Sequence, residues 1–136
     1  YLNRAVGGIR AQITVASIGP AEIVTSPGET CPEYFIGRKA STSRYRHLGW
    51  PDYAFPSMPA LVHGMKGREK ILLSLANNYL GYLVPKSDLV PTYEIHHPNH
   101  YEELVTSGDN FGDSIGNKIF QLLGSPQRFS NHPIRP

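Results

Sequence analysis

Short and widely separated hydrophobic patterns constrain the fold of this 136-residue chain most strongly. Its 13 glycines and 12 prolines break regular structure and favour turns, so helices and strands are expected to be brief. Hydrophobic residues nevertheless make up 40% of the chain and charged residues only 18%, which is the balance of a globular protein. We therefore expect a single region, residues 1–136, with a hydrophobic core, short elements and long loops.

Three strands are predicted. Apolar and polar residues alternate from residue 9 to 15, which is typical of a half-buried strand. The pair Gly19-Pro20 marks a turn, and Ala21 to Thr25 then forms the second strand of a hairpin. Further along, Glu69 to Ala76 contains a continuous apolar run, which favours a strand that is buried on both faces. These strands predict a mainly β core.

Two helices are predicted at the periphery of this core. A proline at the first helical position predicts a short helix from Pro32 to about Ala40. The clearest helix runs from about residue 113 to 123, where Asp113 or an earlier polar residue would cap it and Gly124 and Pro126 would end it. Its apolar stripe consists of Ile115, Ile119, Leu122 and Leu123.

The remaining segments lack clear periodicity. Residues 41–68 and 79–110 are expected to be long ordered loops, of the kind that often shape a site, and residues 125–136 are expected to be an irregular tail. The predicted fold class is therefore α+β, with a hairpin and a buried strand at its centre and a few peripheral helices.

Charge, hydropathy and cysteine content exclude several classes of protein. The formal net charge of +2, without any run of Lys or Arg, does not support binding to nucleic acid. The longest apolar run, around Ile71 to Leu75, is too short to cross a membrane, and no signal peptide is recognisable. Cys31 is the only cysteine, which excludes an intramolecular disulfide and a cysteine-based zinc finger. Because the chain begins with Tyr1, we expect a processed product or a longer polypeptide whose start is missing.

The first candidate site residue is Glu29. The sequence Pro27-Gly28-Glu29 places a carboxylate directly after a predicted strand and before a predicted helix, and the glycine allows a sharp turn. At a strand end this carboxylate can face a cleft, whereas at a helix start it can stabilise the helix N-terminus through the dipole. The pattern alone favours the second explanation.

The second candidate is the segment Asn77-Asn78-Tyr79-Leu80-Gly81-Tyr82, which follows the predicted buried strand. Amide and phenol groups at the end of a central strand are well placed for a site. The ordinary alternative is that the tyrosine rings pack and their hydroxyl groups bond locally.

The third candidate is the loop that contains His96, His97 and His100 beside two glutamates. Imidazole and carboxylate groups are metal ligands, but Pro98 opposes a helix and leaves these side chains without a fixed ligand geometry. We therefore interpret this segment as a polar loop rather than a zinc site.

Four motifs, in order, resemble the neutral/alkaline (non-lysosomal) ceramidase family from about residue 9 to 124. Ile13 to Glu29 resembles the family's strand–turn–strand that ends in P-G-E, and Gly37-Arg38-Lys39 resembles its G-R-R. Leu73 to Tyr82 resembles its segment G-L-S/A-N-x-Y-x-x-Y, and Tyr101 to Gly112 resembles its Y-E-x-x-S/T block. The pair Pro32-Glu33 is similar to bacterial members described only as ceramidase-like.

The resemblance implies a catalytic zinc ion held by two histidines, one glutamate and one tyrosine. Glu29 matches the glutamate and Tyr82 matches the tyrosine, which is also expected to act in catalysis. The two histidines and the family's catalytic serine belong to an upstream region that this chain does not contain. The chain therefore corresponds to the C-terminal part of a larger catalytic domain, and Asn77, Asn78 and Tyr79 are expected to shape the site or contact the substrate.

The function implied is zinc-dependent hydrolysis of an amide bond in a ceramide-like or other N-acyl lipid substrate. Zinc would lower the pKa of a bound water towards about 7 and polarise the amide carbonyl. An upstream segment or a separate chain would supply the histidines, and an extracytoplasmic or secreted location is expected. Two alternatives stay open, namely a non-catalytic binding or assembly subunit with the same fold, and an amidohydrolase or peptidase with another substrate.

Overall fold

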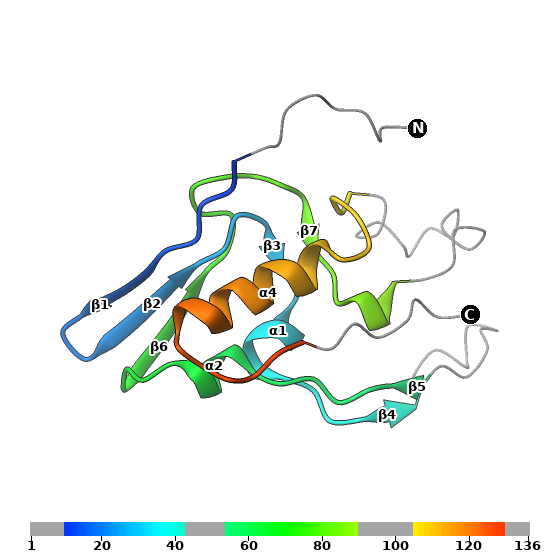
Figure 1. Cartoon of the computed structure of the whole chain (residues 1–136), viewed down its shortest axis with the longest axis horizontal. Helices are drawn as coiled ribbons and strands as arrows, with labels where there is room; N and C mark the ends of the chain where they lie inside the picture. Colours follow the sequence, from blue (N-terminus) through cyan, green and yellow to red (C-terminus); the bar gives the residue numbers. More distant parts are fainter. Residues whose placement is uncertain (1–9, 43–53, 90–104, 130–136) are drawn as a thin grey trace.

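The computed structural model describes residues 10–42, 54–89 and 105–129 (Figure 1). The described part is a mixed α and β structure with small sheets and few helices, which agrees with the α+β prediction at that level. In chain order the elements are β1 (Val15–Ile18), β2 (Ala21–Thr25), β3 (Glu29–Thr30), α1 (Pro32–Ile36), β4 (Ser41–Thr42), β5 (Ala54–Phe55), α2 (Leu61–Gly64), β6 (Glu69–Leu73), β7 (Tyr82–Leu83), η2 (Lys86–Asp88) and α4 (Phe111–Leu122).

The strands form a three-stranded sheet and two strand pairs. In the larger sheet, β1 and β2 are antiparallel and β6 is parallel to β2, in the order β1-β2-β6. The predicted hairpin is confirmed, and β2 has the predicted bounds. The pair β3 and β7 is parallel, whereas β4 and β5 are antiparallel.

The first strand begins later than predicted. The alternation indicated residues 9 to 15, but β1 spans Val15–Ile18. The Thr25 amide still donates to the Thr14 carbonyl at 2.9 Å. The Thr14 amide, however, donates to the Thr25 side-chain oxygen at 2.8 Å, so a hydroxyl replaces the backbone acceptor and the regular ladder stops there.

The hydrophobic core lies between the larger sheet and the helices. Its largest fully buried side chains are those of Tyr34 on α1 and Phe120 on α4. Phe129 reaches back from the chain that follows α4, with its ring 4.8 Å from Tyr34 and 5.0 Å from Phe120. The other buried members of this cluster are Val24, Met58, Leu61, Met65, Leu83, Ile119 and Leu123.

Helix α1 and the loop prediction for residues 41–68 both need correction. Helix α1 ends at Ile36, four residues before the expected end, because Gly37 adopts φ of 74°, outside the right-handed helical region. The segment that follows contains α2 and the short strands β4 and β5. Apolar residues before α2 are buried in the core, so tertiary packing orders a segment whose periodicity was too weak to predict.

Strand β6 is shorter and more exposed than predicted. The sequence indicated a strand from Glu69 to Ala76 that is buried on both faces, but β6 ends at Leu73 and lies at an edge of its sheet. Most of its residues are exposed, including Ile71 and Leu73. The strand ends at Leu73 because Leu75 and Asn77 adopt left-handed backbone conformations, with φ of 57° and 73°.

The C-terminal helix is confirmed, and the residue at its N-cap position is the earlier polar residue Asn110 rather than Asp113, without a side-chain cap hydrogen bond. Helix α4 begins at Phe111, so Asp113 lies inside its first turn and is buried. The hydroxyl of Tyr34 donates to Asp113 Oδ1 at 2.6 Å, and the Val84 carbonyl lies 3.2 Å from the same hydroxyl. Burial, followed by this hydrogen bond, raises the pKa of the Tyr34 phenol far above its ordinary value. Asp113 therefore ties α4 to α1.

Candidate functional site

The structure brings Glu29 and Tyr82 side by side. They are direct partners in the parallel pair of β3 and β7, and Thr30 pairs with Leu83 one position later. An isolated parallel bridge then joins Tyr82 to Thr106 on its other side. Because directly paired residues share a face, Glu29, Tyr82 and Thr106 form one row of oxygen-bearing side chains, which we call the Glu29 row.

The face that carries this row is opposite the core. Leu83 follows Tyr82 in β7 and is fully buried in the hydrophobic cluster. Successive strand residues point to opposite faces, so Tyr82 and its partner Glu29 point away from the core. Both are half-buried, and within the described ranges no group donates a hydrogen bond to the Glu29 carboxylate. That carboxylate remains available for a ligand.

A dense set of backbone hydrogen bonds holds the row in place. The Leu75 amide donates to the Gly28 carbonyl at 3.1 Å, and the Leu80 amide donates to the Pro27 carbonyl at 2.9 Å. The Glu29 amide donates to the Gly81 carbonyl at 3.0 Å. Two motifs that are far apart in the sequence are therefore joined through their main chains, which fixes the register of Glu29 against Tyr82.

Two glycines are required for this close contact. A Cβ atom at Gly28 would lie 2.5 Å from the Gly81 carbonyl oxygen, where real Cβ atoms essentially never lie. Gly81 has φ of 79°, and a Cβ atom there would overlap the carbonyl of Val105. These two motif glycines therefore allow the strands to approach, in addition to allowing the turn that the sequence indicated.

Thr106, the third member of the row, and its neighbour Ser107 were not predicted as site residues. Thr106 Oγ1 donates to the Tyr82 carbonyl at 2.9 Å, and Ser107 Oγ donates to the Leu80 carbonyl at 2.7 Å. The Tyr82 amide donates to the Val105 carbonyl at 3.3 Å. The only sequence signal for this contact was the shared order of motifs, because nothing local marks these residues as neighbours of Tyr82.

The residues expected to shape the site lie in the loop between β6 and β7. The Asn77 amide nitrogen donates to Thr25 Oγ1 at 3.2 Å, and Asn78 Oδ1 accepts from the Gln12 amide at 3.2 Å. Both side chains thus bind the loop to the hairpin side of the molecule. Tyr79 is 68% exposed and extends from the loop surface. Their expected contacts with substrate stay a prediction.

The motif Gly37-Arg38-Lys39 has a structural role in this arrangement. Arg38 Nη1 lies 2.6 Å from Asp88 Oδ2, and Nη2 donates to Ser87 Oγ at 2.9 Å. The guanidinium also lies over the Phe55 ring, 4.9 Å from its centroid. Arg38 therefore connects η2 to the β4–β5 pair and lies apart from the Glu29 row.

The donors of the Glu29 row fit a zinc ion in part. Carboxylate oxygen is an established zinc ligand, and a neighbouring dication allows a phenol oxygen to bind. In the ranges 10–42, 54–89 and 105–129, no group of three or more His, Cys, Asp or Glu side chains could hold a metal ion. The assignment of Glu29 and Tyr82 as two of the four ligands of a zinc ion therefore stays a prediction. His96, His97 and His100 lie outside the described residues.

Comparison with known proteins finds no relative of this chain. No protein-family model, curated protein or solved structure matches the chain. Among the described residues, no helix has the length and apolar character needed to cross a bilayer.

Proposed function

We propose that this chain is the C-terminal part of the catalytic domain of a ceramidase-like zinc amidase. It would hydrolyse an amide bond in an N-acyl, lipid-like substrate, with Glu29 and Tyr82 as two ligands of the metal ion. The observation that carries the proposal is the direct pairing of Glu29 with Tyr82 in neighbouring parallel strands. The two residues that the motif resemblance selects are neighbours in the fold, and both point away from the core.

Each residue of the row has a distinct role in this proposal. Zinc, when bound, would activate water and polarise the amide carbonyl. Glu29 would bind the ion through its carboxylate. Tyr82 would bind more weakly through its phenol oxygen, which can also stabilise the negative charge that develops on the carbonyl oxygen. Thr106 would hold the Tyr82 backbone through the hydrogen bond that its hydroxyl donates.

A partner segment must complete the site. Two oxygen donors are fewer than a catalytic zinc site requires, and the motif resemblance implies that two histidines come from an upstream segment or a separate chain. We therefore expect this chain alone to bind zinc weakly and to hydrolyse no amide. Robust turnover of an N-acyl substrate by the isolated chain would contradict the proposal that this chain and a partner segment share the site.

The test is a comparison of variants in the complex that this chain forms with its co-purifying polypeptide. Zinc content, melting temperature and hydrolysis of a fluorescent N-acyl sphingosine are measured for the natural protein, Glu29→Ala and Tyr82→Phe. Glu33→Ala is the matched control, because Glu33 is also half-buried but lies on α1. Loss of a supporting residue alone costs about 10- to 100-fold in affinity or activity, so a direct ligand should cost at least that.

The proposal predicts a specific order of effects. Glu29→Ala should lose zinc, Tyr82→Phe should lose turnover with a smaller loss of zinc, and Glu33→Ala should change neither. All three should keep a melting temperature close to that of the natural protein. If Tyr82→Phe keeps full activity, or Glu29→Ala keeps its zinc, these residues are structural and the amidase proposal fails.

A second candidate function is a non-catalytic binding or assembly subunit. It is favoured by one observation, which is that the larger sheet presents exposed apolar side chains, including Ile71 and Leu73. A stable complex that contains this chain, no zinc and no amidase activity would support the binding subunit over the enzyme.

A further inference from the structure

Two hydroxyl groups lie under the bend that carries Glu29. Thr30 Oγ1 donates a hydrogen bond to Ser26 Oγ at 2.8 Å, so the two ends of this bend are joined through their side chains. The Ser26 side chain is completely buried, whereas Thr30 is half-buried. A buried hydroxyl costs stability unless it is hydrogen-bonded, so the Ser26 hydroxyl relies on this contact.

These hydroxyls lie on the side of the strand pair that faces the core. Thr30 pairs with Leu83, and Leu83 is buried in the hydrophobic cluster. Successive strand residues point to opposite faces, so the side chain of Thr30 points towards the core side while that of Glu29 points away from it. The two hydroxyls are therefore not part of the Glu29 row, and any effect on Glu29 has to pass through the backbone of the bend.

The contacts converge on the peptide group that joins Gly28 to Glu29. The carbonyl oxygen of Gly28 lies 3.4 Å from each of the two hydroxyl oxygens and accepts from the Leu75 amide at 3.1 Å. The Glu29 amide, at the other end of the same peptide group, donates to the Gly81 carbonyl at 3.0 Å. Because a peptide group is planar, contacts at both of its ends fix its orientation. They thereby help to set the direction in which the Glu29 side chain leaves the backbone.

The peptide group that follows Glu29 is held as well. The Thr30 amide donates to Ser74 Oγ at 3.4 Å. At the start of the bend, the Ser26 amide donates to the Leu73 carbonyl at 2.9 Å. Both ends of the bend are therefore attached to the chain that leaves β6, and the two hydroxyls close the bend between them.

We infer that the hydroxyls of Ser26 and Thr30 form a brace that positions Glu29 for the metal ion. This role rests on the proposed function, because Glu29 is a ligand only under that proposal. Ser26 and Thr30 are positioning residues, which hold Glu29 in register with Tyr82 from the opposite face. Thr106 has the corresponding role for Tyr82, whose carbonyl accepts a hydrogen bond from the Thr106 hydroxyl at 2.9 Å. Each of the two ligands thus has its own threonine.

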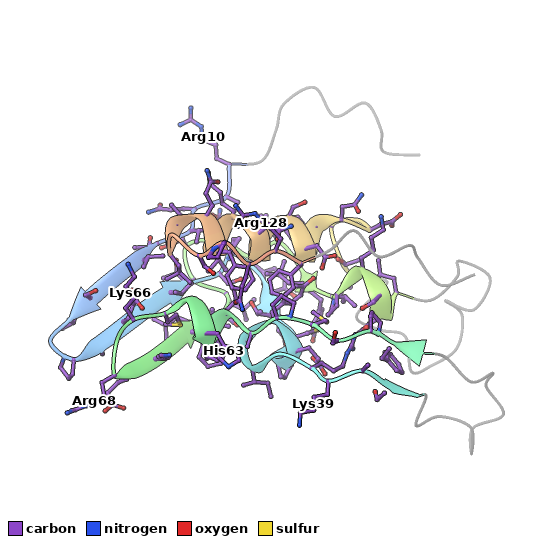
Figure 2. All side chains as sticks on the ribbon, turned by 60° about the horizontal axis from the view of Figure 1, so that its bottom comes forward. Arg10, Lys39, His63, Lys66, Arg68 and Arg128 are labelled. Atoms are coloured by element: carbon purple, nitrogen blue, oxygen red, sulfur yellow. The ribbon has the colours of Figure 1, made fainter. Side chains whose placement is uncertain are left out.

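The brace consists of uncharged groups. Cationic side chains such as those of Arg10, Lys39 and Arg68 extend outwards from the surface instead (Figure 2). Salt screens exposed charges strongly, but it has little effect on a hydrogen bond between two neutral groups that are shielded from water. Added sodium chloride should therefore leave the position of Glu29 unchanged, unlike an arrangement held by surface ion pairs.

The first pair of variants removes and then restores the hydroxyl of Thr30. Thr30→Val keeps a β-branched side chain but deletes the hydroxyl, whereas Thr30→Ser keeps the hydroxyl. Hydrogen exchange of the Glu29 amide, followed by NMR on the full chain, reports how firmly its bond to the Gly81 carbonyl is held. Thr30→Val should speed this exchange about tenfold, and Thr30→Ser should restore most of the natural rate. The measurement needs no zinc, so it tests the brace independently of the proposed function.

Two further threonines make the test specific. Thr106→Val removes the hydroxyl that holds Tyr82, so it should speed exchange of the Tyr82 amide more than that of Glu29. Thr30→Val should produce the reverse order. Thr14→Val removes a half-buried hydroxyl that accepts from the Gln12 side chain, and it should change neither amide. A general loss of stability would instead speed both amides equally in every variant.

Zinc affinity then connects the brace to the metal site. In the complex with the co-purifying polypeptide, Thr30→Val should raise the zinc dissociation constant about tenfold while the variant stays folded, and Thr30→Ser should restore it. Unchanged exchange of the Glu29 amide in Thr30→Val, or no rescue by Thr30→Ser, would overturn the brace itself. Unchanged zinc affinity in Thr30→Val, when Glu29→Ala loses zinc, would overturn its positioning role alone. If Glu29→Ala also keeps its zinc, that role and the proposed function fail together.

Discussion

The core around Tyr34 and the Glu29 row lie on opposite faces of the same small structure and use their polar groups in opposite ways. In the core, the Tyr34 hydroxyl is buried and bonded to Asp113. In the row, backbone hydrogen bonds and the Thr106 hydroxyl hold the strands together, while the side chains of Glu29 and Tyr82 point away from the core. The first arrangement uses a side-chain pair to stabilise the fold, and the second holds the backbone of two polar residues in a fixed register.

The same contrast occurs within a single strand. Leu72 packs against the core, whereas its neighbour Leu73 lies on the opposite face of the sheet and is 47% exposed. A strand with one face in a core needs apolar residues only at alternate positions, so Leu73 adds little to the packing of the described residues.

The largest expected effect is the loss of stability when a side chain in the core is truncated. Phe120 is completely buried and stacks on Phe129. Phe120→Ala should lower the free energy of unfolding by about 3–5 kcal/mol, because it removes buried apolar area and leaves a cavity. Leu122→Ala, on the exposed side of the same helix, should cost less than about 1 kcal/mol. Urea denaturation measures both, and equal losses would contradict the assignment of faces on α4.

The next largest effect disrupts the close backbone contacts that hold the Glu29 row in place. Gly81→Ala places a Cβ atom against the Val105 carbonyl and also strains a backbone with φ of 79°. Gly124→Ala is the matched control, because Gly124 has φ of 69° but has open space around its Cβ position. Strain alone costs about 1–3 kcal/mol at either position. Gly81→Ala should cost clearly more and shift the NMR signals of Glu29, and equal costs would exclude the close contact.

A smaller effect tests the buried hydrogen bond between Tyr34 and Asp113. Tyr34→Phe leaves the buried Asp113 without its phenol donor and should cost about 1–3 kcal/mol at neutral pH. Urea denaturation of the variant and the natural protein measures this loss.

The same variant tests the raised pKa of Tyr34, which follows from burial and then from Asp113. Below about pH 10 the phenol is protonated in both states, so its contribution to stability is fully present. Above about pH 10 the unfolded chain loses this proton while the folded chain keeps it, so stability should fall by up to about 1.4 kcal/mol per pH unit. Tyr34→Phe should remove this component, and the exposed Tyr79→Phe should retain it. Identical pH profiles for all three proteins would refute the raised pKa.

The smallest expected effect is on the exposed face of the sheet β1-β2-β6, which carries Leu73. Leu73→Thr should change the free energy of unfolding of the isolated chain by less than about 0.5 kcal/mol, because Leu73 is largely exposed. Leu72→Thr should cost more, since Leu72 packs against the core. Urea denaturation compares them directly. A larger loss for Leu73→Thr than for Leu72→Thr would contradict the assignment of the two faces of this sheet.

Local sequence patterns predicted the helices and strands whose structure is determined by residues close in the sequence. The hairpin around Gly19-Pro20 and the helix α4 were recognisable, because each pattern is set by residues close in the sequence. The predicted apolar stripe of α4 was wrong in two positions, since Leu122 is 47% exposed and the fully buried Phe120 was not included. The patterns missed β3 and β7, which have two residues each and exist only because they pair with one another. They also gave no sign of the hydrogen bond between Asp113 and Tyr34, which lie far apart in the sequence.

The candidate site was predicted in a different way. Glu29 and Tyr82 were selected by motif order, and the zinc ion that the resemblance assigns to both implied that they are close in space. The structure brings them together, but in β3 and β7 rather than at the ends of the two longer strands. Thr106 could not be predicted, because its position in the row depends on the backbone contact of Tyr82 with Val105.

The most direct test of the shared metal site is a zinc titration of this chain, followed by NMR signals of the Glu29 carboxylate and the Tyr82 phenol. If the two side chains hold one ion, both signals should move along the same saturation curve. In Glu29→Ala the Tyr82 signal should then require much more zinc, by about tenfold or more. The two residues do not share a metal ion if the Tyr82 signal of Glu29→Ala moves at the same zinc concentrations as that of the natural protein. The same conclusion follows if neither signal of the natural protein responds to zinc.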